Sequence, residues 1–385
     1  MKYTLDDLFV LGKRSGNKKR SYLLIDPLQA KHLPVSPTKA LAMMDALGEQ
    51  LSAAYPDTGC IIGFAETATA VAAQAAMHFP PHTIYLQTTR EKVGDERNPF
   101  LLVFSEDHSH AVKQQLRTDL MAKQLKFSLL NDRPVMLIDD EISTGRTAAN
   151  IIKSIDGAMP LLSRYISGYV IGSVINRMDS STREGYAAQG IDCASLVFAD
   201  VEGLEERAAR FSEEPPAELA DIPAAAFEDI SVDKKLPDPK MGGVFVHDLK
   251  MWLNAFTDEA FELIKDRLPE RGRVLVMGTE ECMLPALYLG KMVGEKTGAE
   301  VYSHSTTRSP IGICHDEDYP VREGYHIASF YEAGRDTYIY CPADYDMVIA
   351  VTDSRDKEQS RRAMDDITRV FAGKCERFLL VTPNT

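Results

Sequence analysis

The sequence lacks long hydrophobic runs, and it lacks the amino-terminal pattern of a secreted protein. No window approaches the roughly 18 uninterrupted apolar residues that a membrane-spanning helix needs. Residues 1–7 read MKYTLDD, which contains no apolar core of a signal peptide. We therefore expect no membrane span and no cleaved leader, and a soluble protein of the cytoplasm.

Cysteine is scarce, and its spacing is unlike that of a metal site or a disulfide framework. The chain has six cysteines among 385 residues, and none of them forms a C-x-x-C pair. We expect reduced thiols in a cytosolic protein that needs neither zinc nor disulfides to fold. The six are Cys60, Cys193, Cys282, Cys314, Cys341 and Cys375.

Basic residues are fewer than acidic ones. Lys and Arg number 43 against 57 Asp and Glu, which gives a formal net charge of −14. An acidic surface repels phosphate backbones, so nucleic acid is not expected as a partner. A local basic patch remains compatible with a small phosphorylated ligand. The length of 385 residues and the hydrophobic fraction of 44% predict two ordinary globular domains.

Two α/β patterns, separated by a proline-rich segment, make up the chain. Short apolar segments alternate with helical ones in each half, which predicts buried parallel strands connected by helices. Residues 203–240 hold five of the 20 prolines and indicate a linker. We therefore predict an α/β domain at 1–202, this linker, and a second α/β domain at 241–385. Expected strands include 60–64, 83–87, 100–104, 135–138, 169–175, 273–277, 300–303, 346–351 and 377–381, and expected helices include 37–54, 66–77, 110–127, 147–155, 284–293 and 358–371.

The two halves share an order of short motifs. GFAETATA begins at Gly63 and TTR at Thr88, each after an expected strand, while GTEECMLP begins at Gly278 and TTR at Thr306. The later segments PVMLIDDEISTGRT and DMVIAVTDSRDKEQS also correspond. This order indicates a diverged internal duplication. The alternative is that any two βαβ units share such a pattern.

The strongest chemical signal follows the apolar run 135–138. Asp139 and Asp140 stand at the carboxyl end of this expected strand and can accept hydrogen bonds from ribose hydroxyls, directly or through a divalent ion. The next loop opens a helix, whose amino end can bind a phosphate. Gly145 lets the backbone approach that phosphate closely. The sequence therefore predicts a phosphorylated-sugar site with a loop made of Ser143, Thr144, Gly145, Arg146 and Thr147.

This segment resembles the motif that binds phosphoribosyl pyrophosphate (PRPP) in type I phosphoribosyltransferases. The resemblance implies a parallel-sheet transferase domain, PRPP and an unidentified base as partners, and Mg²⁺ held by Asp139 and Asp140. It departs from the family at Glu141, where the family usually has an apolar or small residue. Glu141 either alters the metal and ribose contacts or points to solvent.

Other segments fit the same resemblance. Phe64, Ala65, Glu66 and Thr67 hold the place of the pyrophosphate loop, whose N–H groups bind a diphosphate. Glu66 opposes an anion unless Mg²⁺ lies between them, and its alternative role is that of a helix amino-terminal residue favoured by the dipole.

Residues 89–110 resemble the mobile catalytic loop of these enzymes. Arg90 and Lys92 are candidates to neutralise departing pyrophosphate, or else ordinary loop cations. The segment with His108 and His110 resembles a metal or acid–base cluster, but no third ligand is evident. The favoured alternative is that one histidine orients substrate or caps the next helix and the other is exposed.

The segment around Arg177 and Asp179 resembles the fifth strand and following turn of orotate phosphoribosyltransferase. The resemblance makes both residues candidate neighbours of the base. A helix cap and a surface ion pair are the alternatives.

The whole chain resembles the two-domain PRTase–TRSP proteins of bacterial tellurium-resistance and stress gene neighbourhoods. The sequence TRSP occurs at 307–310, and GTEECMLPALYLG and YDMVIAVTDS fit the second domain of that group. Glu280 and Arg308 are the candidate ligand contacts of this TRSP-type domain. Arg308 either binds a carboxylate or phosphate or belongs to a structural turn. Residues 353–356 replace the acidic pair and phosphate loop without a glycine, so we expect no PRPP site there.

These motifs favour one function over two others. The favoured one is PRPP-dependent transfer of ribose 5-phosphate to a base, in the synthesis of a nucleotide-like metabolite linked to stress. The alternative is a regulator that binds PRPP or a nucleotide without turnover. An unrelated dehydrogenase or kinase is disfavoured because neither G-x-G-x-x-G nor a P-loop motif is present. A homodimer is left open.

Overall fold

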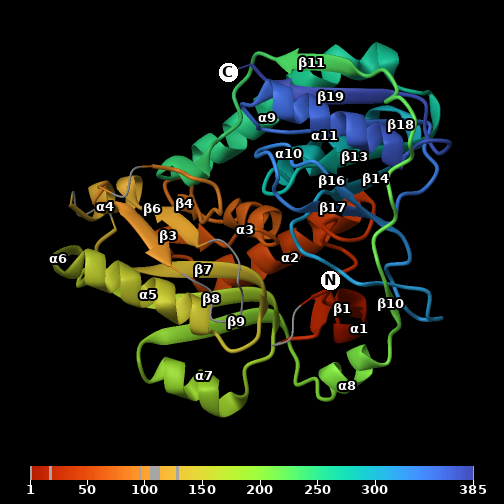
Figure 1. Cartoon of the computed structure of the whole chain (residues 1–385). Coiled ribbons are helices and arrows are strands. Elements are labelled where there is room, and N and C mark those ends of the chain that lie inside the picture. The colour runs from red at the N-terminus through yellow and green to blue at the C-terminus, as the bar shows by residue number, and fades with distance from the viewer. Residues whose placement is uncertain (1, 17–19, 95–96, 105–112, 127–129, 385) are drawn as a thin grey trace. The chain divides into compact units, whose positions relative to one another are not determined.

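The computed structural model describes residues 2–16, 20–94, 97–104, 113–126 and 130–384 (Figure 1). The chain is of the α/β class and divides into two compact units. Unit 1 comprises Met1–Leu5, Met43–Glu202 and Pro237–Met251, and unit 2 comprises Asp6–Ala42, Gly203–Leu236 and Trp252–Thr385.

Unit 1 contains a six-stranded sheet in the order β12-β4-β3-β7-β8-β9. Five of the strands are parallel, and only β12 runs antiparallel, at the edge beside β4. The parallel strands at its centre contain continuous apolar runs, at 60–62, 84–86 and 135–138, as expected for a sheet buried on both faces. Their bounds are β3 Cys60–Gly63, β4 Ile84–Gln87, β7 Arg133–Ile142, β8 Ile166–Asn176, β9 Ile191–Phe198 and β12 Val244–Phe245.

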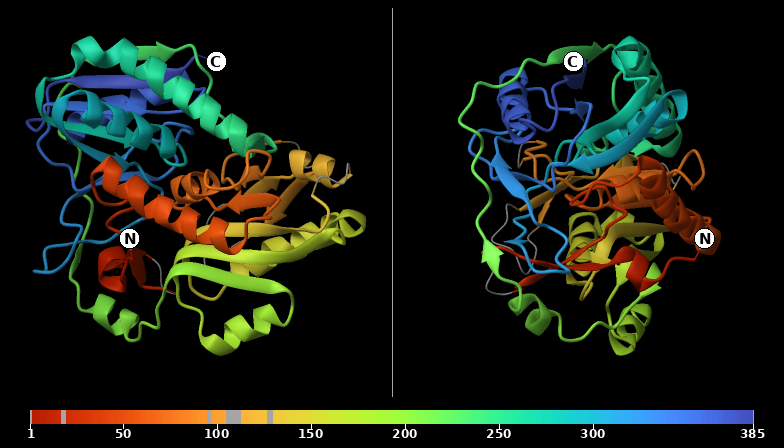
Figure 2. Two further views of the ribbon diagram at one scale, coloured as in Figure 1. Left: turned by 180° about the vertical axis from the view of Figure 1, so that it is seen from behind. Right: turned by 90° about the vertical axis from the view of Figure 1, so that its right-hand side faces the viewer.

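Helices cover both faces of this sheet (Figures 1 and 2). On one face lie α2 and α3, and α3 approaches so closely that a Cβ at Gly63 would lie 2.5 Å from the Ala72 Cβ. On the other face Met121 of α4 and Ile151 and Ile155 of α5 join the core formed with the strands. The bounds are α2 Pro37–Ala54, α3 Thr69–Ala76, α4 Asp119–Lys126, α5 Arg146–Ala158, α6 Pro160–Ser163 and α7 Ser180–Ala187.

A hairpin stands where one helix was expected. The prediction of a helix over 110–127 is wrong in its first half, because the chain forms strand β6 before α4 begins at Asp119. Leu116 of β6 is buried and pairs opposite Leu102 of β5, so tertiary pairing outweighs the helical pattern. The bounds are β5 Leu101–Phe104 and β6 Gln114–Arg117.

Unit 2 contains a five-stranded parallel sheet in the order β11-β19-β18-β13-β14. Helices α9 and α10 cover one face. Helix α11 and the hairpin β16–β17 cover the other. The bounds are β11 Glu228–Val232, β13 Arg271–Gly278, β14 Gly298–Ser305, β16 Gly324–Ile327, β17 Thr337–Tyr340, β18 Met347–Val351, β19 Phe378–Pro383, α9 Val246–Ile264, α10 Leu284–Lys296 and α11 Lys357–Val370.

The division into units differs from the sequence-based boundaries of 1–202, 203–240 and 241–385. Residues 203–236, expected as a linker, supply two strands and a helix to unit 2. Ile230 and Val232 explain the difference, because they alternate with exposed residues along β11 and enter the core beside β19. The amino-terminal residues 6–42 also belong to unit 2. The remaining elements are α1 Leu5–Leu8, β1 Val10–Lys13, β2 Tyr22–Ile25, α8 Leu204–Ala209, β10 Glu213–Glu214, β15 Ile313–Cys314 and the short 3₁₀ turns Pro239–Met241 and Lys265–Arg267.

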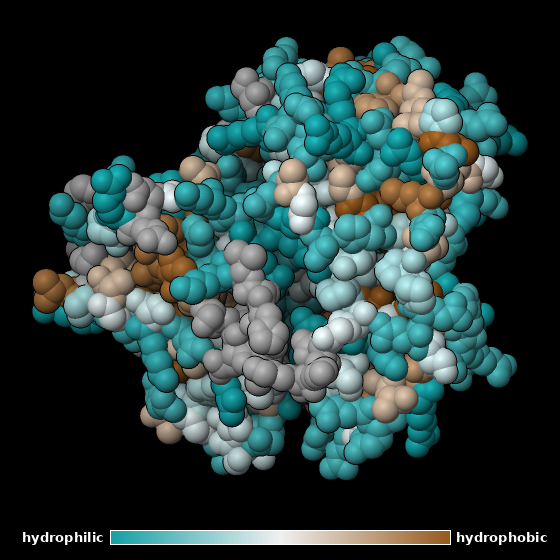
Figure 3. Space-filling view, viewed as in Figure 1, coloured by the Kyte–Doolittle hydropathy of each residue, from teal (hydrophilic) through white to brown (hydrophobic). Residues whose placement is uncertain are grey.

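Hydrophilic residues cover most of the face shown in Figure 3, and hydrophobic ones form small separate patches there. Among the residues described, no helix is both long and apolar enough to cross a membrane. All six cysteines lie in the described ranges, and none of them forms a disulfide.

Candidate functional site

The site of unit 1 lies at the carboxyl ends of β3 and β7. These strands are neighbours, but β3 leads through α3 to β4 on one side while β7 leads through α5 to β8 on the other. Their loops diverge, which is the position where open α/β sheets bind ligands. Thr67, after β3, donates a hydrogen bond of 2.8 Å from its hydroxyl to Asp140 Oδ1. The predicted pyrophosphate loop and the predicted acidic pair are therefore in contact.

Asp139 and Asp140 end the apolar part of β7 and are half-buried. Asp139 Oδ1 accepts a hydrogen bond of 3.0 Å from the Asp140 N–H. Mg²⁺ commonly takes one or two carboxylates and completes its shell with water and substrate phosphates. The described residues contain no cluster of three or more His, Cys, Asp or Glu side chains around one point. Two adjacent carboxylates fit a metal that arrives with its substrate.

The loop after β7 ends in a helix start whose N-cap residue supplies no side-chain hydrogen bond, and the first helical N–H, that of Arg146, donates to the Thr144 hydroxyl at a long 3.4 Å. Gly145 is the N-cap of α5 and has φ of +71°, in the left-handed region. A Cβ there would lie 2.7 Å from Met178 Sδ and 3.0 Å from the Tyr186 ring. The position therefore requires glycine. The first N–H groups of a helix seek acceptors, and an uncapped start offers them to an anion.

Glu141, the residue that departs from the family pattern, points toward the end of β8. Its carboxylate lies 3.3 Å from the Arg177 guanidinium, and both side chains are 14% exposed. The Arg177 N–H donates to the Ile142 carbonyl at 2.8 Å, which holds this pair beside the phosphate loop. Neither alternative given for Glu141 included this ion pair with Arg177, which accounts for the charge at 141.

Asp179 caps a helix. Its carboxylate accepts hydrogen bonds from the Ser181 hydroxyl at 2.6 Å, the Thr182 N–H at 2.7 Å and the Thr182 hydroxyl at 2.9 Å. These hydrogen bonds, that of Ser181 first, lower the pKa of Asp179 to about 2. Contacts of Arg177 and Asp179 with a base stay a prediction.

The pyrophosphate loop is held by a residue that the sequence did not single out. The Ala65 N–H donates to the Thr88 hydroxyl at 2.8 Å, and that hydroxyl donates to Gln114 Oε1 at 2.6 Å. Gln114 Nε2 donates back to the Ala65 carbonyl at 3.2 Å. Gln114 was missed because its segment was predicted as helix. Phe64 and Glu66 of the same loop are also buried.

The predicted catalytic loop is described only in part. Its start is fixed, since Thr89 exchanges backbone hydrogen bonds of 2.9 and 2.8 Å with Gln115 of β6. Arg90 is half-buried and Lys92 is exposed. His108 and His110 lie outside the described residues.

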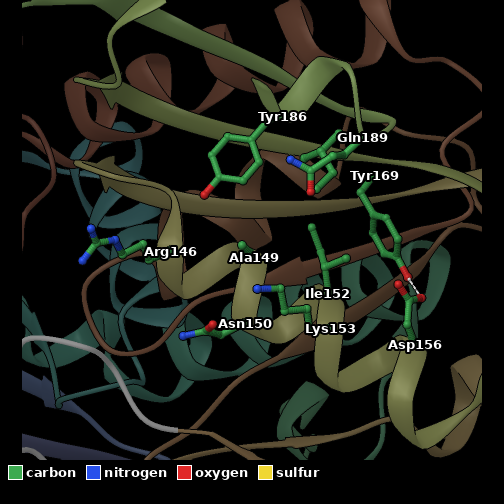
Figure 4. Close-up of a pocket in the computed structure, with 10 residues that line it drawn as sticks. Arg146, Ala149, Asn150, Ile152, Lys153, Asp156, Tyr169, Tyr186 and Gln189 are labelled. Carbon is green, nitrogen blue, oxygen red and sulfur yellow. Dashed lines mark hydrogen bonds between the residues drawn. The ribbon is translucent and has the colours of Figure 1, made fainter. Parts of the chain in front are cut away.

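Unit 1 also has a hollow of about 540 Å³ that the sequence did not predict (Figure 4). It runs along α5, with Tyr169, Tyr186 and Gln189 on the opposite side. Tyr169 donates a hydrogen bond of 2.7 Å to Asp156, and burial raises the pKa of this phenol. Only Arg146 of the predicted phosphate loop lines it, so the hollow is a neighbour of the loop rather than part of it.

The loops of unit 2 repeat the geometry of unit 1. The order β14-β13-β18-β19 matches β4-β3-β7-β8, with α10 and α11 in the places of α3 and α5. The Glu280 N–H donates to the Thr306 hydroxyl at 3.0 Å, as Ala65 does to Thr88. Thr307 exchanges backbone hydrogen bonds with Tyr338 of hairpin β16–β17, as Thr89 does with β6. These matched contacts support the internal duplication.

The two second-domain candidates are in contact. Arg308 Nε donates to Glu280 Oε2 at 2.5 Å, and the Glu280 side chain is fully buried. Arg335 Nη1 donates to the same oxygen at 3.0 Å. Lys31, also fully buried, donates to the carbonyls of Glu280 at 2.6 Å and Thr306 at 3.0 Å. Lys31 and Arg335 were missed because they lie 249 and 55 residues from Glu280 in the sequence.

Each half of the chain matches the model of a known protein family. The family model described as "Phosphoribosyl transferase" matches residues 8–200, and the model described as "TRSP domain C terminus to PRTase_2" matches residues 244–368. No curated protein gave a significant match.

Solved structures of phosphoribosyltransferases resemble part of this chain at low identity. An adenine phosphoribosyltransferase from Trypanosoma brucei, solved with AMP, pyrophosphate and ribose-5-phosphate, is 12% identical over 50% of this chain and 77% of its own, with a TM-score of 0.34. An orotate phosphoribosyltransferase from Aeropyrum pernix is 18% identical over 45% and 77%, with a TM-score of 0.26. Likenesses at this level add nothing to the family match.

Proposed function

The chain belongs to the phosphoribosyl transferase family and continues into a TRSP domain, and from this premise we propose that unit 1 transfers ribose 5-phosphate from PRPP to a nitrogenous base. One observation carries the proposal above the others. The hydrogen bond between Thr67 and Asp140 joins the two diverging loops beside an uncapped helix start. Sites for a diphosphate, a ribose and a phosphate thus adjoin one another.

Each part of PRPP has a place in this proposal. The 5′-phosphate binds the N–H groups and hydroxyls of residues 143–147. The ribose hydroxyls donate to Asp139 and Asp140. The pyrophosphate group binds the backbone of residues 64–67.

The reaction needs no nucleophile from the protein. A nitrogen of the base forms a bond to C1 of the ribose, and the C1–O bond to pyrophosphate breaks with its electron pair leaving on pyrophosphate. The nitrogen then gives up its proton. The protein contributes positioning and neutralisation of charge, to which Arg90 and Lys92 are assigned. His108 and His110 stay predicted contributors.

Asp139 and Asp140 would hold Mg²⁺, as the carboxylate pair described above fits it. The ion would supply positive charge to the pyrophosphate oxygens. We further propose a nucleotide-like product, in a stress or tellurium-resistance response of the cytoplasm, on the family resemblance alone.

The test is pyrophosphate release from PRPP and Mg²⁺ by the full chain, with a panel of nucleobases and a small-molecule cell extract as acceptors. Asp139→Asn/Asp140→Asn is the inactive variant. Asp57→Asn is the matched control, because Asp57 is exposed and precedes β3, at the amino edge of the sheet.

Release that depends on an acceptor, persists in Asp57→Asn and is lost in the double variant would establish the transferase. Fractionating the extract would then identify the base. Tight PRPP binding with no release from any acceptor would replace the transferase with a PRPP-binding regulator. Absence of PRPP binding would refute both.

A further inference from the structure

The loops of unit 2 hold a buried carboxylate where unit 1 has alanine. Ala65 and Glu280 make the same backbone hydrogen bond to the threonine that follows the next strand, so they occupy equivalent positions in the repeat. The alanine side chain ends at its Cβ, whereas the glutamate carboxylate reaches Thr337 of β17, in the hairpin β16–β17. The substitution places one negative charge at the centre of the unit 2 loops.

Four donors converge on this carboxylate. Arg308 and Arg335 bind Oε2, as described above, while Ser329 donates from its hydroxyl to Oε1 and Thr337 does so at 3.4 Å. All come from the loop and hairpin that follow β14. Two guanidiniums and two hydroxyls around two oxygens form the coordination that proteins give to a bound oxoanion. Here the oxoanion is part of the chain.

Asp353, the residue of unit 2 that is equivalent to Asp140, also accepts a hydrogen bond from the chain itself. Ile138 pairs with Gly63 and Val351 pairs with Gly278, so Asp140 and Asp353 each come two residues after equivalent positions. Asp353 Oδ1 accepts a hydrogen bond of 2.5 Å from the Tyr331 hydroxyl. Burial, together with the Asp353 carboxylate, raises the pKa of Tyr331 well above its ordinary value, so the phenol remains a donor.

The N–H groups of the second loop are taken by its own side chains. Ser354 N–H donates to the Thr352 hydroxyl at 3.2 Å, and Asp356 N–H donates to the Ser354 hydroxyl at 3.3 Å. The Asp356 carboxylate caps α11 by accepting from the Gln359 N–H at 2.9 Å. In unit 1 the corresponding helix begins at Gly145 without such a cap.

From this geometry we propose that unit 2 contains an oxoanion site whose occupant is the protein's own Glu280 carboxylate. The built-in anion holds the hairpin loop onto the sheet and excludes PRPP. Removing Glu280 leaves Arg308 and Arg335 buried, at 10% and 13% exposure, with Glu281 at 3.7 Å from Arg308 and the exposed Glu332 on Arg335 as their remaining carboxylates. The removal makes room for a small carboxylate, phosphate or pyrophosphate between the two guanidiniums. The proposal concerns unit 2 and does not depend on turnover in unit 1.

The test uses thermal unfolding of the full chain in acetate, phosphate or pyrophosphate against chloride at equal ionic strength. Glu280→Ala is expected to lower the midpoint of unfolding by on the order of 10 °C. Each oxoanion is expected to restore part of this loss, with a saturable concentration dependence. Glu332→Ala is the matched control, because Glu332 binds the same Arg335 but its side chain is 65% exposed. It should gain no more from oxoanions than the unaltered chain does.

Refolding yields and the variant Glu280→Gln extend the test to a Glu280→Ala chain that does not fold and to the role of charge. If Glu280→Ala does not fold in chloride, its refolding yield in each anion becomes the readout, and recovery in oxoanions supports the proposal. Glu280→Gln fills the same space without charge and should show no anion-specific gain. The proposal is overturned if Glu280→Ala shows no saturable gain or recovery in any oxoanion. Binding of a second equivalent of PRPP to the unaltered chain would also overturn it. Failure of PRPP turnover in unit 1 would leave all these readouts in place.

Discussion

The two sheets of this chain have matching strand orders, but the loops at their carboxyl edges are held in different ways. Unit 1 places Ala65 in its first loop and Gly145 at the helix start that ends its second loop, and this N-cap residue supplies no side-chain hydrogen bond to α5. Unit 2 places Glu280 and Asp356 at the matching positions, and both carboxylates accept hydrogen bonds from the chain itself. The comparison teaches that one fold supplies a binding edge or a packed edge according to where its donors are directed.

The sharpest way to break this comparison is to neutralise the equivalent acids. Asp140→Asn should reduce pyrophosphate release by at least about 100-fold, because the residue binds ribose and metal in the proposed site. Asp353→Asn should leave the rate within about twofold, since that carboxylate binds Tyr331 instead of substrate. Steady-state rates of both variants provide the measurement. Equal losses would show that the two halves serve one reaction.

A second substitution introduces the glutamate of unit 2 at the equivalent position of unit 1. Ala65→Glu should reduce turnover by about 100-fold or more, because a carboxylate in the pyrophosphate loop repels the diphosphate. Ala65→Gln fills a similar volume without charge and separates repulsion from loss of space. PRPP affinity, measured by calorimetry, should fall further for the glutamate than for the glutamine. The same affinity for both would assign the effect to size alone.

Much of the fold follows from local pattern, because buried parallel strands are apolar without interruption and their helices are amphipathic. Helix 37–54 matches its expected bounds, and the parallel strands β3, β4, β7, β8, β13, β14, β18 and β19 lie where apolar runs predicted them, whereas β9 was not predicted. The family match and the α/β fold with a second α/β domain confirm the recognition made from the motif around Asp139. The sequence did not predict β6 and β11 as strands, because both depend on tertiary pairing, with β5 and β19 respectively.

The candidate site was predictable only where its residues adjoin one another in sequence. The acidic pair and the phosphate loop are one segment, so their order alone indicates phosphate and ribose chemistry. Gln114 and Arg335 act through contacts across 49 and 55 residues, and no local pattern announces such contacts. The contact of Glu141 with Arg177 likewise depends on how β7 and β8 pair.

A third prediction concerns the backbone of the phosphate loop. Gly145→Ala should destabilise the chain by ~1–3 kcal/mol, through the left-handed backbone and the contact with Met178, and should weaken PRPP binding about tenfold. Gly157→Ala is the control in the same helix, because a Cβ there meets nothing within 4 Å. It should be neutral or stabilising by less than about 1 kcal/mol. Denaturant unfolding and PRPP titration measure both effects. A stable, fully binding Gly145→Ala would remove the loop from the site.

A buried histidine of unit 2 is expected to make the stability of the chain depend on pH. Burial is the main cause that lowers the pKa of His304 in unit 2 from 6.5 to about 4. The folded chain keeps this imidazole neutral while the unfolded chain protonates it, so stability is full above pH 6.5 and is lost as pH falls toward 4. The loss from this residue is at most about 3 kcal/mol. Unfolding free energies of the unaltered chain and His304→Gln, compared across this range, isolate it from the carboxylates. A glutamine variant with the same pH slope would show that the imidazole is protonated in the folded chain, and so that the core beneath the unit 2 loops is open to water.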